Sequence, residues 1–158
     1  MKVLGIDPGT AITGFGVVET GNGTPGLGRL VECGVIRLTA RGPLPRRLAE
    51  LHAAIVALIR RHRPTALALE DAFYHRNVRT TLVLGHARGV VLLAAQQAGI
   101  LIAEYPPATV KKTVVGVGDA RKPQVGAMVA RLLRLRQAPK PSDAADGVAV
   151  ALTHLLRR

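Results

Sequence analysis

The residues of this chain best suited to chemistry are its carboxylates, since only 10 of its 158 residues are Asp or Glu. Asp7 and Glu70 each follow a short apolar run, and Asp143 and Asp146 stand three residues apart near the start of a helical pattern. Residues at i and i+3 share a helix face, and ligand sites of open α/β sheets lie beyond the carboxyl ends of the strands. We therefore expect these four carboxylates to meet at one edge of a sheet.

Carboxylates gathered in this way repel one another and raise one another's pKa values unless a cation joins them. Oxygen-only ligands favour Mg²⁺ or Mn²⁺. Each acid also has a structural explanation when taken singly, Asp7 as a turn residue before Pro8 and Asp143 as an acid at a helix N-terminus. Chance convergence of all four is much less expected, and a metal site is favoured.

The charge of the chain indicates what such a site acts on. Lys and Arg number 22, which gives a formal net charge of +12. So strong a surplus on a folded domain predicts a polyanionic partner, nucleic acid before an anionic membrane surface. Aromatic residues make up only 3%, so recognition of backbone and shape is favoured over repeated base stacking. Acids that hold metal on a basic protein indicate metal-assisted phosphodiester chemistry.

Several other classes are excluded by composition. The hydrophobic fraction of 48% is too high for a disordered chain, and the single Cys33 excludes a disulfide framework or a Cys-cluster metal site. No apolar run reaches the ~18 residues of a membrane span. The N-terminus lacks the pattern of a signal peptide, so we expect a cytoplasmic protein without membrane partners.

The hydrophobic pattern predicts one α/β domain over residues 1–158. Strands are expected over 2–8, 14–20, 29–38, 65–70 and 100–105, and helices over 45–61, 78–98, 109–115, 123–135 and 142–156. Ser142 is the expected N-cap of the last helix. Three strands joined by short loops, followed by βα crossovers, predict a mixed five-stranded sheet flanked by helices.

Six segments of the chain together resemble the RuvC family, bacterial Holliday-junction resolvases with a ribonuclease-H-like fold. The segments are GIDPGT (5–10), TGFGVV (13–18), LEDAFYHRN (69–77), LGHARGV (84–90), YPPATVKKTVVGVGDARKPQV (105–125) and SDAADGVAVALTH (142–154). They occur in the family's order and cover essentially the whole chain. GIDPGT alone also resembles the phosphate-binding hairpin of sugar kinases, whereas VKKTVVGVG and DAAD are much more specific.

The resemblance implies an endonuclease that resolves four-way DNA junctions by paired symmetric nicks, in homologous recombination and DNA repair. It implies that the catalytic and metal-binding residues are Asp7, Glu70, Asp143 and Asp146, with two Mg²⁺ or Mn²⁺ ions per site. The products would carry 5′-phosphate and 3′-hydroxyl ends. Asp71 places an extra acid beside Glu70, which leaves the ligand set open, and Gly147 stands where a larger residue is expected.

The resemblance also implies DNA contacts and partners. Phe73 corresponds to an aromatic residue near the junction centre, and the expected DNA-binding residues are Phe73, Arg76, Lys111, Lys112 and Lys122. A homodimer and a branch-migration helicase complex of RuvA and RuvB are the implied protein partners. The helix over 78–98 is the expected dimer interface, because it carries more apolar surface than a one-sided helix requires. These apolar residues are Val83, Leu84, Ala87, Val90, Val91 and Ala94.

Three alternatives remain open from the residues. A sugar-kinase-like ATPase would need two such domains and usually more than twice this length. Another ribonuclease-H-like nuclease, of the smaller family linked to ribosomal RNA processing, should lack the lysines at 111–112 and the DAAD pair. A non-catalytic structure-specific DNA-binding protein would leave the four acids without a purpose, because acids weaken phosphate binding.

Overall fold

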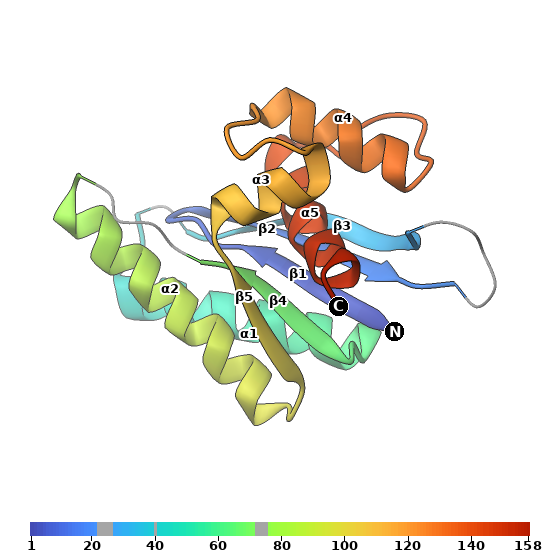
Figure 1. The fold of residues 1–158 in the computed structure, drawn as a ribbon. Coiled ribbons are helices and arrows are strands. Elements are labelled where there is room, and N and C mark those ends of the chain that lie inside the picture. The colour runs from blue at the N-terminus through green and yellow to red at the C-terminus, as the bar shows by residue number, and fades with distance from the viewer. Residues whose placement is uncertain (22–26, 40, 72–75) are drawn as a thin grey trace.

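The computed structural model describes residues 1–21, 27–39, 41–71 and 76–158, and within them five strands build one mixed sheet (Figure 1). The sheet order is β3-β2-β1-β4-β5, antiparallel from β3 to β1 and parallel from β1 to β5. This confirms the predicted mixed five-stranded sheet. The strands are β1 (Lys2–Asp7), β2 (Ile12–Glu19), β3 (Arg29–Arg37), β4 (Ala66–Glu70) and β5 (Leu101–Tyr105).

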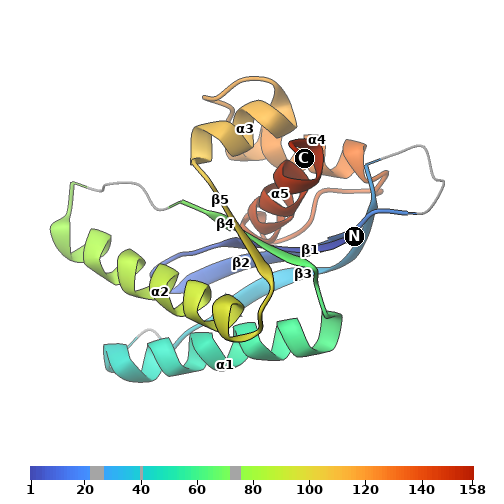
Figure 2. The ribbon, with the colours of Figure 1, turned by 60° about the horizontal axis from the view of Figure 1, so that its bottom comes forward.

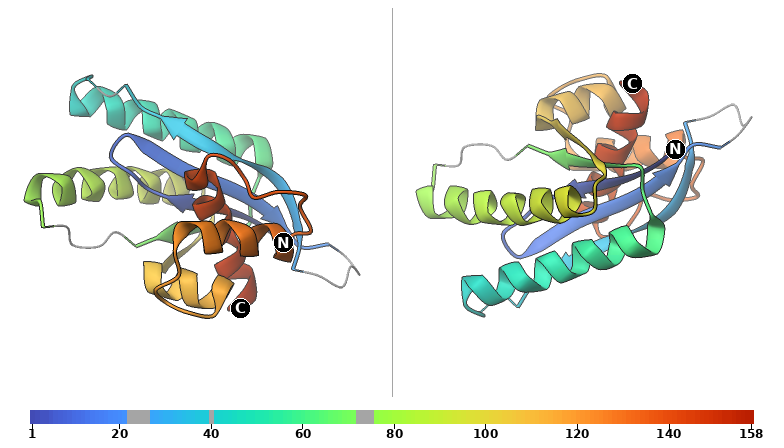
Figure 3. Two further views of the ribbon diagram at one scale, coloured as in Figure 1. Left: turned by 90° about the horizontal axis from the view of Figure 1, so that it is seen from above. Right: turned by 90° about the horizontal axis from the view of Figure 1, so that it is seen from below.

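Helices cover both faces of the sheet. They are α1 (Leu44–His62), α2 (Val78–Gln97), α3 (Pro107–Val115), α4 (Lys122–Leu132) and α5 (Ser142–Leu156). The first two pack on one face and the last three on the other, as Figures 2 and 3 show. Successive residues of β1 therefore enter different cores: Val3 packs with α5, and Leu4 packs with α1 and α2.

The central helix α5 lies directly on the backbone of the β1–β2 hairpin. A Cβ atom added to Gly14 would stand 1.9 Å from the carbonyl oxygen of Asp143, and one added to Gly147 would stand 2.5 Å from the Phe15 backbone. Both contacts are far inside van der Waals distance. The expectation of a larger residue at 147 therefore fails on space, since the hairpin already occupies it. Glycines at these positions let α5 bring its first turn to the end of β1.

Several predicted boundaries are wrong by a few residues. The N-cap of α5 is Pro141 rather than Ser142, which is the first helical residue, and no side chain makes a cap hydrogen bond there. Helix α3 begins at Pro107 instead of residue 109, since proline suits the first helical position. Helix α4 ends at Leu132 instead of 135, before Arg134 adopts a φ of 54°.

Helix α2 carries apolar residues both on the side that packs within the subunit and on its outer side. Leu84, Ala87, Val91 and Ala94 are buried within the subunit, so these four do not form the interface surface expected of them. Its outer side remains exposed and includes Leu82 and Leu93. Among the described residues, α2 is the one helix whose length and mean hydropathy, 1.3, would suffice to cross a membrane. Within the subunit, 28% of that window is buried.

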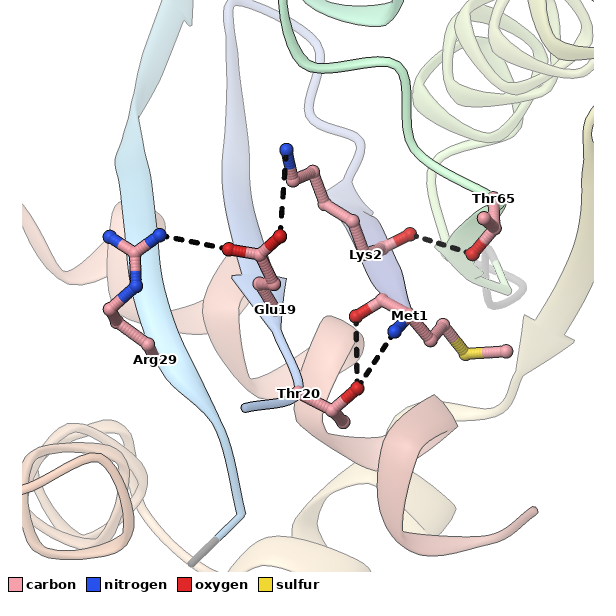
Figure 4. A network of polar contacts seen from close by, with 6 residues as sticks. All are labelled: Met1, Lys2, Glu19, Thr20, Arg29 and Thr65. Carbon is pink, nitrogen blue, oxygen red and sulfur yellow. Dashed lines mark hydrogen bonds and ion pairs between the residues drawn. The ribbon is translucent and has the colours of Figure 1, made fainter. Parts of the chain in front are cut away.

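The end of the sheet where β1 begins is closed by a network of polar contacts (Figure 4). The Glu19 carboxylate lies 3.8 Å from the Lys2 ammonium and 2.8 Å from the Arg29 guanidinium. The N-terminal ammonium of Met1 donates a hydrogen bond of 2.8 Å to the Thr20 hydroxyl. Glu19, at the end of β2, is therefore paired with cations from both neighbouring strands, β1 and β3.

Candidate metal and nucleic-acid site

The four predicted carboxylates converge at the opposite end of the sheet, where β1 and β4 finish side by side. Ile6 pairs with Leu69 in the parallel register, so Asp7 and Glu70 follow at the same edge. Helix α5 adds Asp143 and Asp146 from its first turns. Asp7, Asp143 and Asp146 each offer an oxygen atom, and these atoms lie within 4.8 Å of one another.

A cavity of about 160 Å³ opens beside these acids. Asp7, Glu70 and Asp146 line it from the sheet and α5, and Lys111 of α3 and Lys122 of α4 line it from the facing helices. The cavity thus brings Glu70 to the other acids and two predicted DNA-binding lysines to all of them. Three acids on one wall and two cations on the other suit a phosphate held against metal.

The acids of the cavity disfavour their own ionisation. Burial, together with the negative charges of Glu70 and Asp146, raises the pKa of Asp7 to about 8. Burial also raises the pKa of Glu70 to about 7, with a further contribution from Asp146. Buried like charges adopt this behaviour when no cation neutralises them.

Lys122 supplies part of the missing positive charge. Its ammonium lies 3.0 Å from an Asp146 oxygen and 3.4 Å from an Asp143 oxygen, and these contacts raise the pKa of Lys122. The Lys122 ammonium contacts only Asp143 and Asp146 among the four acids, and the pKa of Asp7 remains raised. The donor set consists of carboxylate oxygens, and those of Asp7, Asp143 and Asp146 lie within 4.8 Å of one another, so the residues present fit Mg²⁺ or Mn²⁺.

The remaining predicted DNA-binding residues stand outside this cavity. Lys112 is exposed on α3, next to Lys111, and does not line it. Arg76 is exposed just before Asn77, the N-cap of α2, whose side chain accepts a hydrogen bond from the Thr80 amide. Phe73 lies outside the described residues.

Asp71, which the sequence left open as a ligand, is held on the other side of β4. The Arg88 guanidinium of α2 lies 3.1 Å from an Asp71 oxygen and also pairs with Glu104 of β5. The Asp71 amide donates a 2.8 Å hydrogen bond to the Tyr105 carbonyl oxygen. Sequence reasoning missed Arg88 because its two partners come from distant elements. Arg88 ties the end of β4, and so Glu70, to α2.

The sheet order, the helices on both faces and the acids at the ends of β1 and β4 define a ribonuclease-H-like protein with a nuclease-type metal site. The sequence profile of the family described as "Crossover junction endodeoxyribonuclease RuvC" matches residues 3–154. Because this match spans nearly the whole chain, the protein belongs to the RuvC family. The resemblance drawn from the six sequence motifs is confirmed, and the enzyme class is that of a nuclease.

Individual relatives give the same assignment. A crossover junction endodeoxyribonuclease RuvC of Koribacter versatilis is 46% identical over 157 residues, covering 98% of this chain and 92% of the relative. The solved Thermus thermophilus RuvC structure superposes with a TM-score of 0.89 at 38% identity, covering 99% of this chain and 94% of the other. A second T. thermophilus RuvC structure, in complex with a Holliday junction substrate, gives a TM-score of 0.87 at 36% identity, with the same coverage.

Proposed function

We propose that this protein resolves four-way DNA junctions by two symmetric nicks, through metal-dependent hydrolysis that leaves 5′-phosphate and 3′-hydroxyl ends. The observation that carries the proposal is the group of acids at the ends of β1 and β4, completed by α5, in a member of the RuvC family. The formal charge of +12 supplies attraction for the DNA backbone.

In this proposal Asp7, Glu70, Asp143 and Asp146 are the catalytic carboxylates and hold two Mg²⁺ or Mn²⁺ ions. Asp7 lies close to both Glu70 of β4 and Asp146 of α5, so its carboxylate would hold metal together with either of them. Ions bound there would activate a water molecule and stabilise the leaving 3′ oxygen. Lys111 and Lys122 face the same cavity and hold the phosphate that is cut.

The other DNA-binding residues predicted from the sequence are also part of the proposal. Phe73 follows Glu70 by three residues and would stack on a base displaced at the crossover. Arg76 and Lys112 are exposed at the same end of the sheet as the acids and would contact phosphates on either side of the site. These residues position the junction, and the carboxylates cut it.

The active species in this proposal is a homodimer formed through α2. Val78, Leu82 and Leu93 are exposed by 63%, 60% and 51%, and they share a helix face with Gly85 and Gly89. A Cβ atom added to either glycine would meet nothing within 4 Å, so the surface is open to close approach by a second helix. A two-fold pair of sites matches the near two-fold symmetry of a four-way junction and its two nicks.

In this proposal the exposed apolar surface of α2 is a protein interface, and the dimer acts in the cytoplasm without a membrane partner. A helicase complex of RuvA and RuvB, implied by the family, would deliver the junction. Light scattering tests the dimer: a monomer at working concentration, both free and on junction DNA, would contradict it.

The activity is tested by incubating the protein with a synthetic four-way junction and with a linear duplex of the same sequence, in Mg²⁺ or Mn²⁺. We expect paired nicks at symmetric positions in the junction, resealed by DNA ligase, and an uncut duplex. Equal cutting of both substrates, or unrelated single nicks, would contradict junction resolution.

A further inference from the structure

A second hollow, of about 490 Å³, lies between the beginnings of α1 and α2. We call it the α1–α2 hollow. Three arginines line it, Arg41, Arg47 and Arg79, together with His86, and no acidic residue lines it among the described residues. Residues of α1 and α2 line the hollow, whereas residues of α3, α4 and α5 line the carboxylate cavity. Figure 2 shows these two groups of helices on opposite faces of the sheet.

The hollow nevertheless belongs to the same end of the molecule as the acids. The Arg47 guanidinium donates a hydrogen bond to the carbonyl oxygen of Thr10, in the turn between β1 and β2. Thr10 is three residues beyond Asp7, and three residues span at most about 11 Å. A DNA strand that leaves the carboxylate cavity and crosses this turn would reach the hollow within a few nucleotides.

Two of the three arginines of the hollow have no acidic partner in the described part of the chain. Arg41 and Arg79 are exposed and form no ion pair with any described residue. The nearby acid of α1, Glu50, is instead engaged by Thr39 and by Arg46, whose guanidinium lies 3.5 Å away. Positive side chains gathered in a hollow without a counter-charge create a local field that attracts an anion.

The walls of the hollow also suit DNA. Pro43, Leu44 and Val83 line it beside the arginines, so the hollow combines aliphatic surface with guanidinium groups. A phosphodiester backbone presents the same combination, charged phosphates separated by apolar sugar faces. Guanidinium groups are well matched to phosphate oxygens, because their fork of N–H donors binds two oxygens at once.

We infer that the α1–α2 hollow is a second phosphate-binding site, which holds the backbone of the junction DNA a few nucleotides from the phosphate that is cut. The inference rests on the proposed function for the identity of the ligand. The hollow fixes the direction in which one DNA arm leaves the carboxylate cavity, and it acts on binding rather than on the chemical step.

The test compares two double variants that remove the same charge. Arg41→Gln/Arg79→Gln removes two positive charges from the hollow. Arg60→Gln/Arg63→Gln removes two exposed arginines near the other end of α1. Junction binding is measured with EDTA, over a range of salt concentrations. We expect the first variant to lose about tenfold in affinity and to lower the salt slope by about 1.8, because each lost phosphate contact lowers it by about 0.9. The control should change much less.

A second arm locates the contact on the DNA. Uncharged methylphosphonate linkages are placed one at a time along the strand on either side of the cut phosphate. At one or two positions away from the cut, the substituted linkage should weaken binding of the wild-type protein. The same substitution should leave binding by Arg41→Gln/Arg79→Gln unchanged. Arg41→Lys/Arg79→Lys keeps the charge and should recover part of the affinity. The melting temperature of each variant confirms that the protein stays folded.

Each contrary outcome is decisive. Equal losses in the two double variants would show a response to net charge alone and overturn the inference. Wild-type affinity in Arg41→Gln/Arg79→Gln, in a protein that still cuts junctions, would overturn the inference and leave the proposed function intact. A wild-type protein that neither binds nor cuts junctions would overturn both.

Discussion

At the end of the sheet where β1 begins, Glu19 lies between Lys2 and Arg29, whereas at the end where β1 finishes, Asp7 lies beside Glu70 and Asp146. The first acid is paired and partly exposed, and the second is buried among like charges that raise its pKa. A carboxylate therefore stabilises the folded state at one end of the sheet and destabilises it at the other. An arrangement that costs stability is typical of a functional site.

The packing of α5 explains how the acids are held together despite their repulsion. Val148, Val150 and Leu152 are fully buried between the sheet and the outer helices, so the helix is fixed along its length. Gly14 and Gly147 then allow its first turn to reach the hairpin. The hydrophobic core of this face thus supplies the stability that the carboxylates remove.

The largest effect on cleavage should come from replacing an acid of the carboxylate cavity by its amide. Asp7→Asn, Glu70→Gln or Asp146→Asn should lower junction cleavage by about a thousandfold or more, because the metal loses a ligand. Junction binding should persist or tighten, since negative charge is removed. Gel assays of cleavage and of binding measure both effects.

Glu19→Gln is the matched control for these variants. It should leave cleavage unchanged and lower stability by no more than about 1 kcal/mol, as expected of an exposed ion pair. Near-normal cutting by any of the three amide variants, with normal metal dependence, would remove that residue from the ligand set.

A smaller effect is expected when the acids are kept but α5 is moved. Gly14→Ala places a methyl group against the Asp143 carbonyl oxygen, so the first turn of α5 must shift by more than an ångström. A displacement of this size in a catalytic group costs about a hundredfold in rate. Cleavage rate and melting temperature are compared with those of Gly118→Ala, where a Cβ would stand 3.5 Å from its nearest neighbour. Full activity of Gly14→Ala would show that α5 is not held where we place it.

The raised pKa values predict how pH alters the stability of the metal-free protein. Asp7 has a pKa of about 8 when folded and 3.8 in its ordinary range, so the folded state binds more protons between these values. Stability from this group is present at low pH and is lost as the pH rises through about 8. Asp7→Asn should therefore raise the melting temperature at about pH 9 and change it little at about pH 4.

Metal should reverse the same effect, because it binds the deprotonated acids. Mn²⁺ or Mg²⁺ should raise the melting temperature of the wild-type protein most at high pH, and should do so much less in Asp7→Asn. Equal stabilisation of both proteins by metal would place the bound ion elsewhere.

The smallest effect should come from Asp71, which Arg88 holds away from the other acids at an exposed position. Asp71→Asn should lower the cleavage rate by less than about tenfold, since a partly exposed ion pair contributes little. Its metal concentration dependence should match that of the wild type. A clear shift in that dependence would make Asp71 a ligand.

The sequence predicted the sheet and its acidic edge because both depend on local patterns. The apolar run before Asp7 and the one before Glu70 mark parallel strands, and the i, i+3 spacing of Asp143 and Asp146 marks one helix face. What it could not predict depends on distant partners. Nothing in the segment around Arg88 indicates that its guanidinium reaches Asp71, just after β4, and Glu104 of β5.

Two local predictions differ from the structure in detail for a related reason. Ser142 has the side chain of an N-cap, but the helix already begins there after Pro141, whose extended backbone ends the preceding loop. The apolar residues of α2 predicted an interface, yet periodicity alone could not say which of them the subunit's own core would bury. The outer stripe that contains Leu82 and Leu93 emerges only when α1 is packed against the helix.

The central claim is that the acids at the end of β1 hold the metal that cuts DNA, and anomalous diffraction from crystals soaked in Mn²⁺ tests it most directly. We predict anomalous density in the cavity between Asp7, Glu70 and Asp146, at a Mn²⁺ concentration that supports cleavage, and none there in Asp7→Asn crystals. Density confined to other acids, such as Glu19 or Glu32, with an empty cavity at that concentration, would contradict the account.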